Sequence, residues 1–209
     1  RKSSVKTLVH VILLNIIISF VATAKNIEIK LFNDPEAQAL EIEKTLDFFI
    51  KAAQSGDKNA EYNVAAYYYF VPNNNKNIPK AVKMLHKLAE EGHPISQYIL
   101  SNMYLSGENV EKNLQEGIKW LQKAADQGIL EAQFYIGLLK YRGIWGIKKD
   151  VNQAIMWLEK AAKQKNSDAQ YNLGIIYFKR GDKIKSLEYL RQAAAQGDTQ
   201  AELFMRKSI

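Results

Sequence analysis

The sequence Ala169-Gln170-Tyr171-Asn172-Leu173-Gly174 contains the pattern that decides the fold of this chain of 209 residues. Its first three residues are a small, a polar and an aromatic residue, and triplets of this type recur, once with Leu in the third place. They begin at Ala60, Ser96, Ala132, Ala169 and Ala201, with spacings of 36, 36, 37 and 32 residues. A period of this length is typical of helical repeat arrays. We therefore predict a fold of stacked helical repeats.

We call the first residue of each triplet the anchor of its repeat. Residues four and five positions after the anchor lie on one helical face and are apolar or small. They are Val64, Leu100, Ile136 and Leu173 at offset four, and Ala65, Ser101, Gly137 and Gly174 at offset five. Glycine inside a helix costs about 1 kcal/mol relative to alanine. Gly137 and Gly174 therefore predict the close approach of a neighbouring helix.

A second helix is predicted in each repeat, because small, bulky and leucine positions recur in a fixed order. The small positions are Ala81, Gly117, Ala154 and Ser186, and the leucines four residues later are Leu85, Leu121, Leu158 and Leu190. The same order of residues recurs around Phe48. We therefore predict that the array begins with a second helix that has no first helix before it. Asp34 would be its N-cap and Pro35 its first residue. Glycine lies four residues before four of the anchors, and Lys165 takes that place once.

These residues resemble the Sel1-like repeats, a family related to the tetratricopeptide repeat. The triplet at Ala169, with Gly174 and Tyr177, is similar to the first helix of the family's unit. Gly143-Ile144-Trp145-Gly146-Ile147 followed by Asp150 looks like its inter-helix loop, and Trp157-Leu158 with Lys160-Ala161-Ala162 looks like its second helix. The resemblance covers about residues 45–205. It implies an all-α fold, a right-handed α-α superhelical solenoid.

The chain departs from the family pattern in two places. Residues 70–75 lack the glycines of the inter-helix loop, and residues 180–183 resemble a plain tetratricopeptide turn. The chain contains no cysteine. It therefore cannot belong to the subgroup with a disulfide in each unit, and activities proposed for that subgroup are not carried over.

The N-terminal sequence predicts export. Residues 1–24 contain three basic residues, then an apolar stretch, then Ala22-Thr23-Ala24, which is typical of a signal-peptidase site. We predict a signal peptide at 1–24, a linker at 25–36 and a Sel1-like repeat solenoid at 37–209, with about four repeats and a partial helix pair at each end. The protein would be periplasmic or secreted, without a membrane span in the mature chain; anchoring by an uncleaved signal is the alternative.

The first helices are expected to line the concave surface of the solenoid, where an aromatic-rich stripe would hold a partner peptide or helix. Its candidate partner-binding residues are Tyr62, Tyr69, Tyr98, Asn102, Leu105, Phe134, Leu138, Tyr141, Tyr171, Ile175 and Phe178. Packing between repeats is the favoured explanation for the four that lie two residues after an anchor. For Asn102, Tyr69, Tyr141 and Phe178, packing and binding remain equal alternatives. Trp145 is either a contact residue or folded over a helix end.

No catalytic centre, cofactor or metal site is predicted. His86 and His93 have no carboxylate pair at ligand spacing, so we interpret both as exposed polar residues. No phosphate-binding loop or nucleophile elbow is present in the sequence. The formal net charge is +7, but three of the cations belong to residues 1–24, and the remaining Lys and Arg are scattered. This pattern does not favour nucleic-acid binding.

The sequence therefore predicts an exported, non-enzymatic interaction scaffold or adaptor, a bacterial envelope protein by family resemblance. Its partner would be a protein held in the concave face of the array. The alternative is an envelope-associated accessory protein that binds cell-wall glycan or a cell-wall enzyme. A hydrolase hidden in the scaffold is disfavoured, because no acid, base and nucleophile constellation is recognisable.

Overall fold

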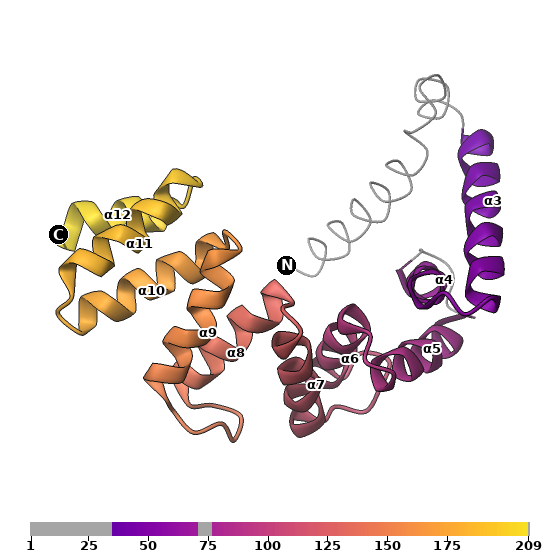
Figure 1. Ribbon diagram of the computed structural model, residues 1–209, viewed down its shortest axis with the longest axis horizontal. Helices are drawn as coiled ribbons and strands as arrows, with labels where there is room; N and C mark the ends of the chain where they lie inside the picture. Colours follow the sequence, from indigo (N-terminus) through magenta and orange to yellow (C-terminus); the bar gives the residue numbers. More distant parts are fainter. Residues whose placement is uncertain (1–34, 71–76, 209) are drawn as a thin grey trace. The chain divides into compact units, whose positions relative to one another are not determined.

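The computed structural model describes residues 35–70 and 77–208, which form ten α-helices and no strand (Figure 1). The all-α fold class predicted from the sequence is confirmed. The first described helix spans Pro35–Gln54, and its predicted N-cap, Asp34, lies outside the described residues. The predicted signal peptide, most of the predicted linker and the loop at 71–76 lie outside the described residues.

The helices alternate between the first and the second position of a repeat. The second-position helices are α3 (Pro35–Gln54), α5 (Ile78–Glu90), α7 (Leu114–Asp126), α9 (Val151–Lys163) and α11 (Lys183–Ala195). The first-position helices are α4 (Lys58–Phe70), α6 (Pro94–Ser106), α8 (Leu130–Arg142), α10 (Ser167–Lys179) and α12 (Thr199–Ser208). The chain forms two compact units, Arg1–Ser96 and Gln97–Ile209, and the boundary lies within α6.

In unit 1, α4 packs against both α3 and α5. Its contact face consists of small and β-branched residues, which allow the helices to approach. The buried residues on α4 include Ala60, Val64 and Ala65, and Leu85 and Leu88 are buried on α5. Apart from Leu88, these are the anchor, the offset-four and offset-five positions and the second-helix leucine of the repeat, so the predicted packing face is confirmed here.

In unit 2, helices that are consecutive in the chain pack against one another from α7 to α12 (Figure 1). The offset-four residues and the second-helix leucines form the interior. Leu100, Ile136, Leu173, Leu121, Leu158 and Leu190 are all almost completely buried. Burial of one such side chain contributes about 1.5–3 kcal/mol. The regular recurrence of these side chains therefore gives each repeat a similar hydrophobic contact with its neighbour.

The two offset-five glycines lie at close helix contacts. A Cβ added to Gly137 would be 2.8 Å from Leu158 Cγ, and one added to Gly174 would be 2.6 Å from Leu190 Cγ. Real Cβ atoms almost never come so close to another carbon, because repulsion rises steeply. The close approach predicted from the sequence is confirmed, and in both cases the neighbour is the second-helix leucine of the same repeat.

The turns between repeats explain the glycines that precede the anchors. Gly56, Gly92, Gly128 and Gly197 all have left-handed φ angles, between 88° and 95°, and Lys165 has a φ of 65° in the same place. A left-handed residue after a helix closes its last turn, and glycine adopts it at least cost. The residue that directly follows caps the next helix in several of these turns: Asp57, Asn166 and Asp198 accept backbone N–H groups.

Candidate functional site

The eleven residues predicted to bind a partner lie on α4 in unit 1 and on α6, α8 and α10 in unit 2. Asn102 is exposed and the other ten are half-buried. We call the nine members in unit 2 the first-helix stripe. Its side chains pack between the repeats and also form part of the surface of unit 2.

Three rings of the stripe connect neighbouring repeats. Tyr98 packs against the cluster that contains Ile136, Phe134 against the cluster that contains Leu173, and Tyr171 against the cluster that contains Ala201. Each ring thus reaches from its own repeat to the next one. Packing accounts for the regular spacing of these aromatic residues, and only their outer edges face solvent.

One group of side chains on α6 and α8 combines exposure with polar atoms. Tyr135 is 46% exposed, and it lies near Tyr98, as does Glu131. Burial raises the pKa of Tyr98 to about 12; a hydrogen bond with Asn102 opposes this rise, and Tyr135 and Glu131 add to it. The Tyr98 phenol is therefore neutral at ordinary pH. We call Tyr98, Asn102, Glu131 and Tyr135 the α6–α8 patch.

Sequence reasoning missed Tyr135 as a surface residue. It lies three positions after its anchor, where the other repeats carry Asn63, Ile99, Asn172 and Phe204. This mixture of polar, aliphatic and aromatic residues gives no clear periodic signal. Exposed aromatic residues are nonetheless among those that contribute most of the binding energy at protein interfaces.

Two other stripe residues are tied to their neighbours. Lys179 Nζ donates a hydrogen bond to the Tyr141 hydroxyl over 3.3 Å. The Phe178 ring meets the Phe204 ring of α12 edge-on, with centroids 5.1 Å apart. Phe178 therefore closes the packing at the last helix, whereas Tyr141 contributes to a polar surface at the end of α8.

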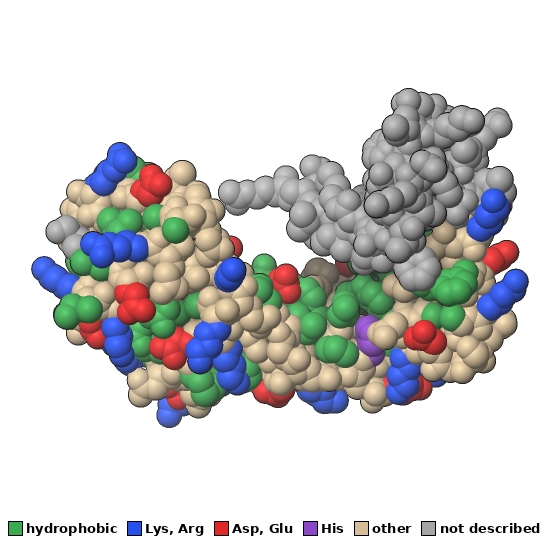
Figure 2. Space-filling model, turned by 45° about the horizontal axis from the view of Figure 1, so that its top comes forward, with side chains coloured by type: hydrophobic (Ala, Val, Ile, Leu, Met, Phe, Trp, Pro, Cys, Tyr) green, Lys and Arg blue, Asp and Glu red, His purple; other side chains and the backbone are tan. Residues whose placement is uncertain are grey.

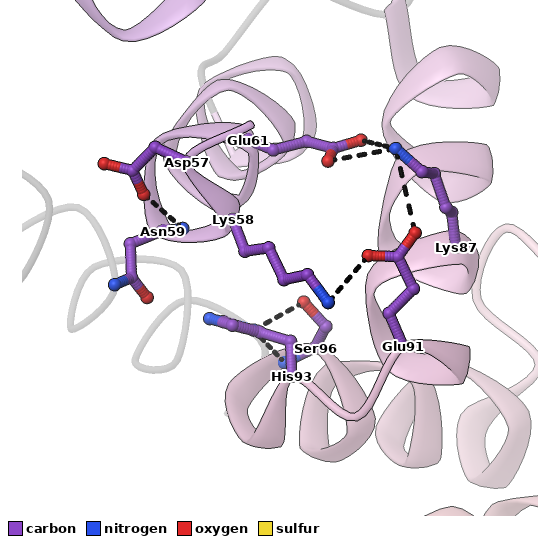
Figure 3. Close-up of polar contacts among 8 residues, drawn as sticks. All are labelled: Asp57, Lys58, Asn59, Glu61, Lys87, Glu91, His93 and Ser96. Carbon is purple, nitrogen blue, oxygen red and sulfur yellow. Dashed lines mark hydrogen bonds and ion pairs between the residues drawn. The ribbon is translucent and has the colours of Figure 1, made fainter. Parts of the chain in front are cut away.

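In unit 1, an ion-pair chain links α4 to the end of α5 (Figure 3). Lys87 Nζ is 3.0 Å from Glu61 Oε1, and Lys58 Nζ is 3.0 Å from Glu91 Oε2. Lys87 also lies 3.9 Å from Glu91, which completes the chain. Both lysines are exposed, and surface pairs of this kind contribute about 0–1 kcal/mol. The chain helps to fix two packed helices and is a structural feature.

His93 has a structural role that the sequence interpretation did not foresee. It is half-buried rather than exposed, and its ring stacks on Tyr62 with centroids 5.0 Å apart. Its Nδ1 accepts the backbone N–H of Ser96 over 3.2 Å and lies 2.9 Å from Ser96 Oγ (Figure 3). His93 thus caps α6. The signal was available, since Asp57, Asn166 and Asp198 occupy the same place in other repeats.

A partly buried polar cluster crosses α9, α10 and α11. Glu159 Oε1 accepts hydrogen bonds from the hydroxyls of Tyr177, at 3.1 Å, and Tyr189, at 3.3 Å. The two rings stack in parallel with centroids 5.8 Å apart. Burial, and then the nearby carboxylate, raise the pKa of both phenols. Both therefore stay protonated at neutral pH and act as hydrogen-bond donors that join three helices.

Charged side chains of both signs are scattered over the face shown in Figure 2, with hydrophobic patches between them. Among the residues that the structure describes, no three His, Asp or Glu side chains are grouped closely enough to hold a metal ion. Over the same ranges, none of the helices combines the length and apolar character needed to span a membrane.

A family model described as Sel1 repeat matches five segments of the chain, residues 41–57, 58–93, 94–129, 130–166 and 167–198. Each of the three segments from 94 to 198 contains one first and one second helix. Among curated protein sequences, none matches the chain.

Two solved structures are similar to the chain at 31% sequence identity. One is a Sel1 repeat protein from Oxalobacter formigenes, with a TM-score of 0.70 over 79% of this chain and 49% of that protein. The other is c5321, a protective antigen of uropathogenic Escherichia coli strains with an SLR fold, with a TM-score of 0.62 over 75% of this chain and 34% of that protein. The chain therefore spans about half of the first protein and about a third of the second.

Proposed function

Because the chain belongs to the Sel1 repeat family, we propose that it is an exported scaffold that holds a segment of a partner protein on its first helices. Sel1 repeat proteins generally act as protein–protein interaction scaffolds. The fold is typically non-enzymatic, and we propose no catalytic activity for this chain. Its basic, apolar and small-residue N-terminal sequence supports export to the periplasm or beyond.

The observation that supports this proposal most directly is the α6–α8 patch. It places an exposed aromatic ring, an exposed amide and a half-buried phenol on two first helices of unit 2. Tyr and Asn supply contact area and adaptable hydrogen bonds, as is common at protein interfaces. The side chains stand on helices rather than loops, so little conformational entropy would be lost when a partner binds.

The test places a photo-crosslinking benzophenone residue at position 102 or 135 of the full chain in its native host. We expect one discrete protein adduct from both positions. The matched control carries the same residue at position 156, because Met156 is equally exposed but belongs to the second helix α9. No adduct should form there.

Specificity is then measured by competition. Excess unlabelled chain should suppress the adduct, and chain with Asn102→Ala and Tyr135→Ala should not, although its helical melt is unchanged. Equal adducts from position 156, or full competition by the double variant, would exclude the α6–α8 patch as the binding surface.

The exposed ring of Tyr135 also fits the second candidate, an accessory protein that stacks on the sugar rings of cell-wall glycan. This candidate predicts that purified, protein-free sacculi retain the chain and that Tyr135→Ala releases it. The protein-scaffold proposal predicts no retention. Retention of the chain by protein-free sacculi therefore distinguishes the two functions.

A further inference from the structure

The loop between α8 and α9, residues 143–150, differs from its counterpart between α6 and α7, residues 107–113. In both loops an added Cβ on the first glycine would collide with a lysine Cβ near the end, Lys112 in one and Lys149 in the other. The loops therefore share their ends, but the α8–α9 loop holds one additional residue. That residue lies in the segment Ile144-Trp145-Gly146.

Trp145 is an unusual residue at the tip of this loop. Its side chain is 44% exposed, and its φ of 56° is in the left-handed region that bulky residues rarely adopt. Ile144 beside it is 37% exposed. Left-handed bulky residues are enriched at functional sites, and tryptophan is strongly enriched at the centre of protein interfaces.

Six cations without carboxylate partners lie in this loop, at the end of α8 and at the end of α10. They are Lys140, Arg142, Lys148, Lys149, Lys179 and Arg180, which we call the basic edge. Within the part of the chain that the structure describes, none of the six forms an ion pair. The acids nearest in sequence, Asp150 and Asp182, each use a carboxylate oxygen to cap a helix.

The basic edge is held together in space by neutral groups. Lys149 and Lys179 lie 5.9 and 5.8 Å from the centre of the Tyr141 ring. Arg180 Nη2 donates to Asn152 Oδ1 over 2.7 Å, which brings the end of α10 to the start of α9. In Figure 1 the α8–α9 loop and the α10–α11 turn lie on the same side of unit 2. Two sequence segments thus build one cationic surface beside Trp145.

From this juxtaposition we propose that the basic edge and Trp145 bind an acidic segment of a partner protein that also carries a large apolar side chain. Carboxylates would pair with the unpartnered cations, and the apolar side chain would cover the Trp145 ring. This surface differs from the α6–α8 patch, because it is built from turns and contains neither Asn102 nor Tyr135.

A neighbouring acidic loop favours a protein segment over an anionic membrane. The α6–α7 loop carries the exposed acids Glu108 and Glu111. It adjoins the α8–α9 loop, since a Cβ on Gly146 would be 3.1 Å from Nε2 of Gln115, two residues after the α6–α7 loop. A flat anionic surface at the basic edge would also face those acids and be repelled. A protein segment can contact the cations alone.

The test selects ligands for the full chain from a display library of short random peptides. We expect the selected peptides to be enriched in Asp and Glu and to contain a large apolar residue. For the tightest peptide, Lys148→Glu with Lys149→Glu should weaken binding about tenfold or more. The matched control is Lys163→Glu with Arg191→Glu, which makes the same charge change on exposed residues of α9 and α11. It should change the affinity far less.

Trp145→Gly separates a binding role from a structural one. Glycine adopts a φ of 56° without strain, so the Tm should stay unchanged or rise while the peptide binds about tenfold more weakly. A lower Tm would show that Trp145 folds over the helix end. Equal weakening by both charge-reversal pairs, or no acidic enrichment, would overturn the proposal. So would tighter binding to phosphatidylglycerol vesicles, or to single-stranded DNA, than to the selected peptide.

Discussion

Gln164 at the end of α9 donates a hydrogen bond from its side-chain Nε2 to Oε1 of Gln133 on α8, over 2.9 Å. Gln133 in turn donates from its own Nε2 to the carbonyl of Ala125 on α7, over 3.2 Å. One buried amide thus joins three consecutive helices. The next repeat has the same arrangement, with Gln196 donating to Gln170 and Gln170 donating to Ala162. The polar second residue of these two triplets, Gln133 and Gln170, therefore fixes the contact between repeats.

Replacement of Gln133 by Leu should destabilise the chain. Gln133 is 6% exposed, and the change removes its hydrogen bonds with Ala125 and Gln164, whereas the Ala125 carbonyl still accepts the Gly128 N–H. Each lost hydrogen bond costs about 0.5–1.5 kcal/mol, so we expect a loss of about 1–3 kcal/mol. The measurement is the free energy of unfolding in urea. The matched control is Gln164→Ala, at the exposed end of the same hydrogen bond, where water replaces the lost partner. Equal losses in the two variants would contradict the three-helix role of Gln133.

Ser186→Ala should stabilise the chain. The Ser186 hydroxyl is completely buried and has no hydrogen-bond partner within the described part of the chain. The equivalent residues Ala81 and Ala154 show that a methyl group fits this position. Removal of a buried hydroxyl without a partner should raise the free energy of unfolding by about 1 kcal/mol. A urea titration that shows a loss of stability would reveal a hydrogen bond or bound water at this site.

The helix pairs and their packing faces could be predicted because their signals are local. Gly137 needed only its place in the helical period to indicate a close contact, and a glycine recurs four residues before most anchors, at 56, 92, 128 and 197, where the structure has the turns between repeats. These positions recur at nearly constant spacing. Each repeat therefore gave independent support to the same prediction.

The surface could not be predicted to the same degree, because its features occur once. Tyr135 has no exposed aromatic counterpart at offset three in the other repeats, and the loop equivalent to that of Trp145 carries no tryptophan, so periodicity is silent about both. The stripe was found from its period, and the structure shows that this period partly reflects packing between repeats.

Gly137→Leu should destabilise the contact between α8 and α9. The new side chain would meet Leu158, whose Cγ would be 2.8 Å from the added Cβ and whose backbone N would be 3.2 Å away. The backbone cannot move aside as a side-chain end can, so we expect a loss of about 1–3 kcal/mol. The matched control on the same helix is Tyr135→Leu at an exposed position, which should change stability by less than about 0.5 kcal/mol. Equal melting temperatures for the two variants would exclude a tight contact at Gly137.

His93→Asn should remove a pH dependence of folding stability. Burial, and then the charge of Lys58, lower the pKa of His93. The capping Nδ1 must be unprotonated to accept the Ser96 N–H, so the fold favours the neutral ring. The contribution of this cap is therefore complete above the unfolded pKa of about 6.5 and is lost as pH falls through the lower folded pKa. Asparagine caps helices at any of these pH values, as Asn166 does in α10.

The measurement compares urea unfolding of the wild-type chain and His93→Asn at pH values on both sides of 6.5. The variant loses the stacking with Tyr62, so it should be less stable than wild type at the higher pH. Its free energy of unfolding should nevertheless fall less on acidification, because the unfolded state no longer gains a proton at this position. His86 is present in both chains, so its titration cancels in the comparison. An identical pH dependence in the two chains, or an NMR titration of folded His93 with a pKa above 6.5, would show that the cap does not require the neutral ring.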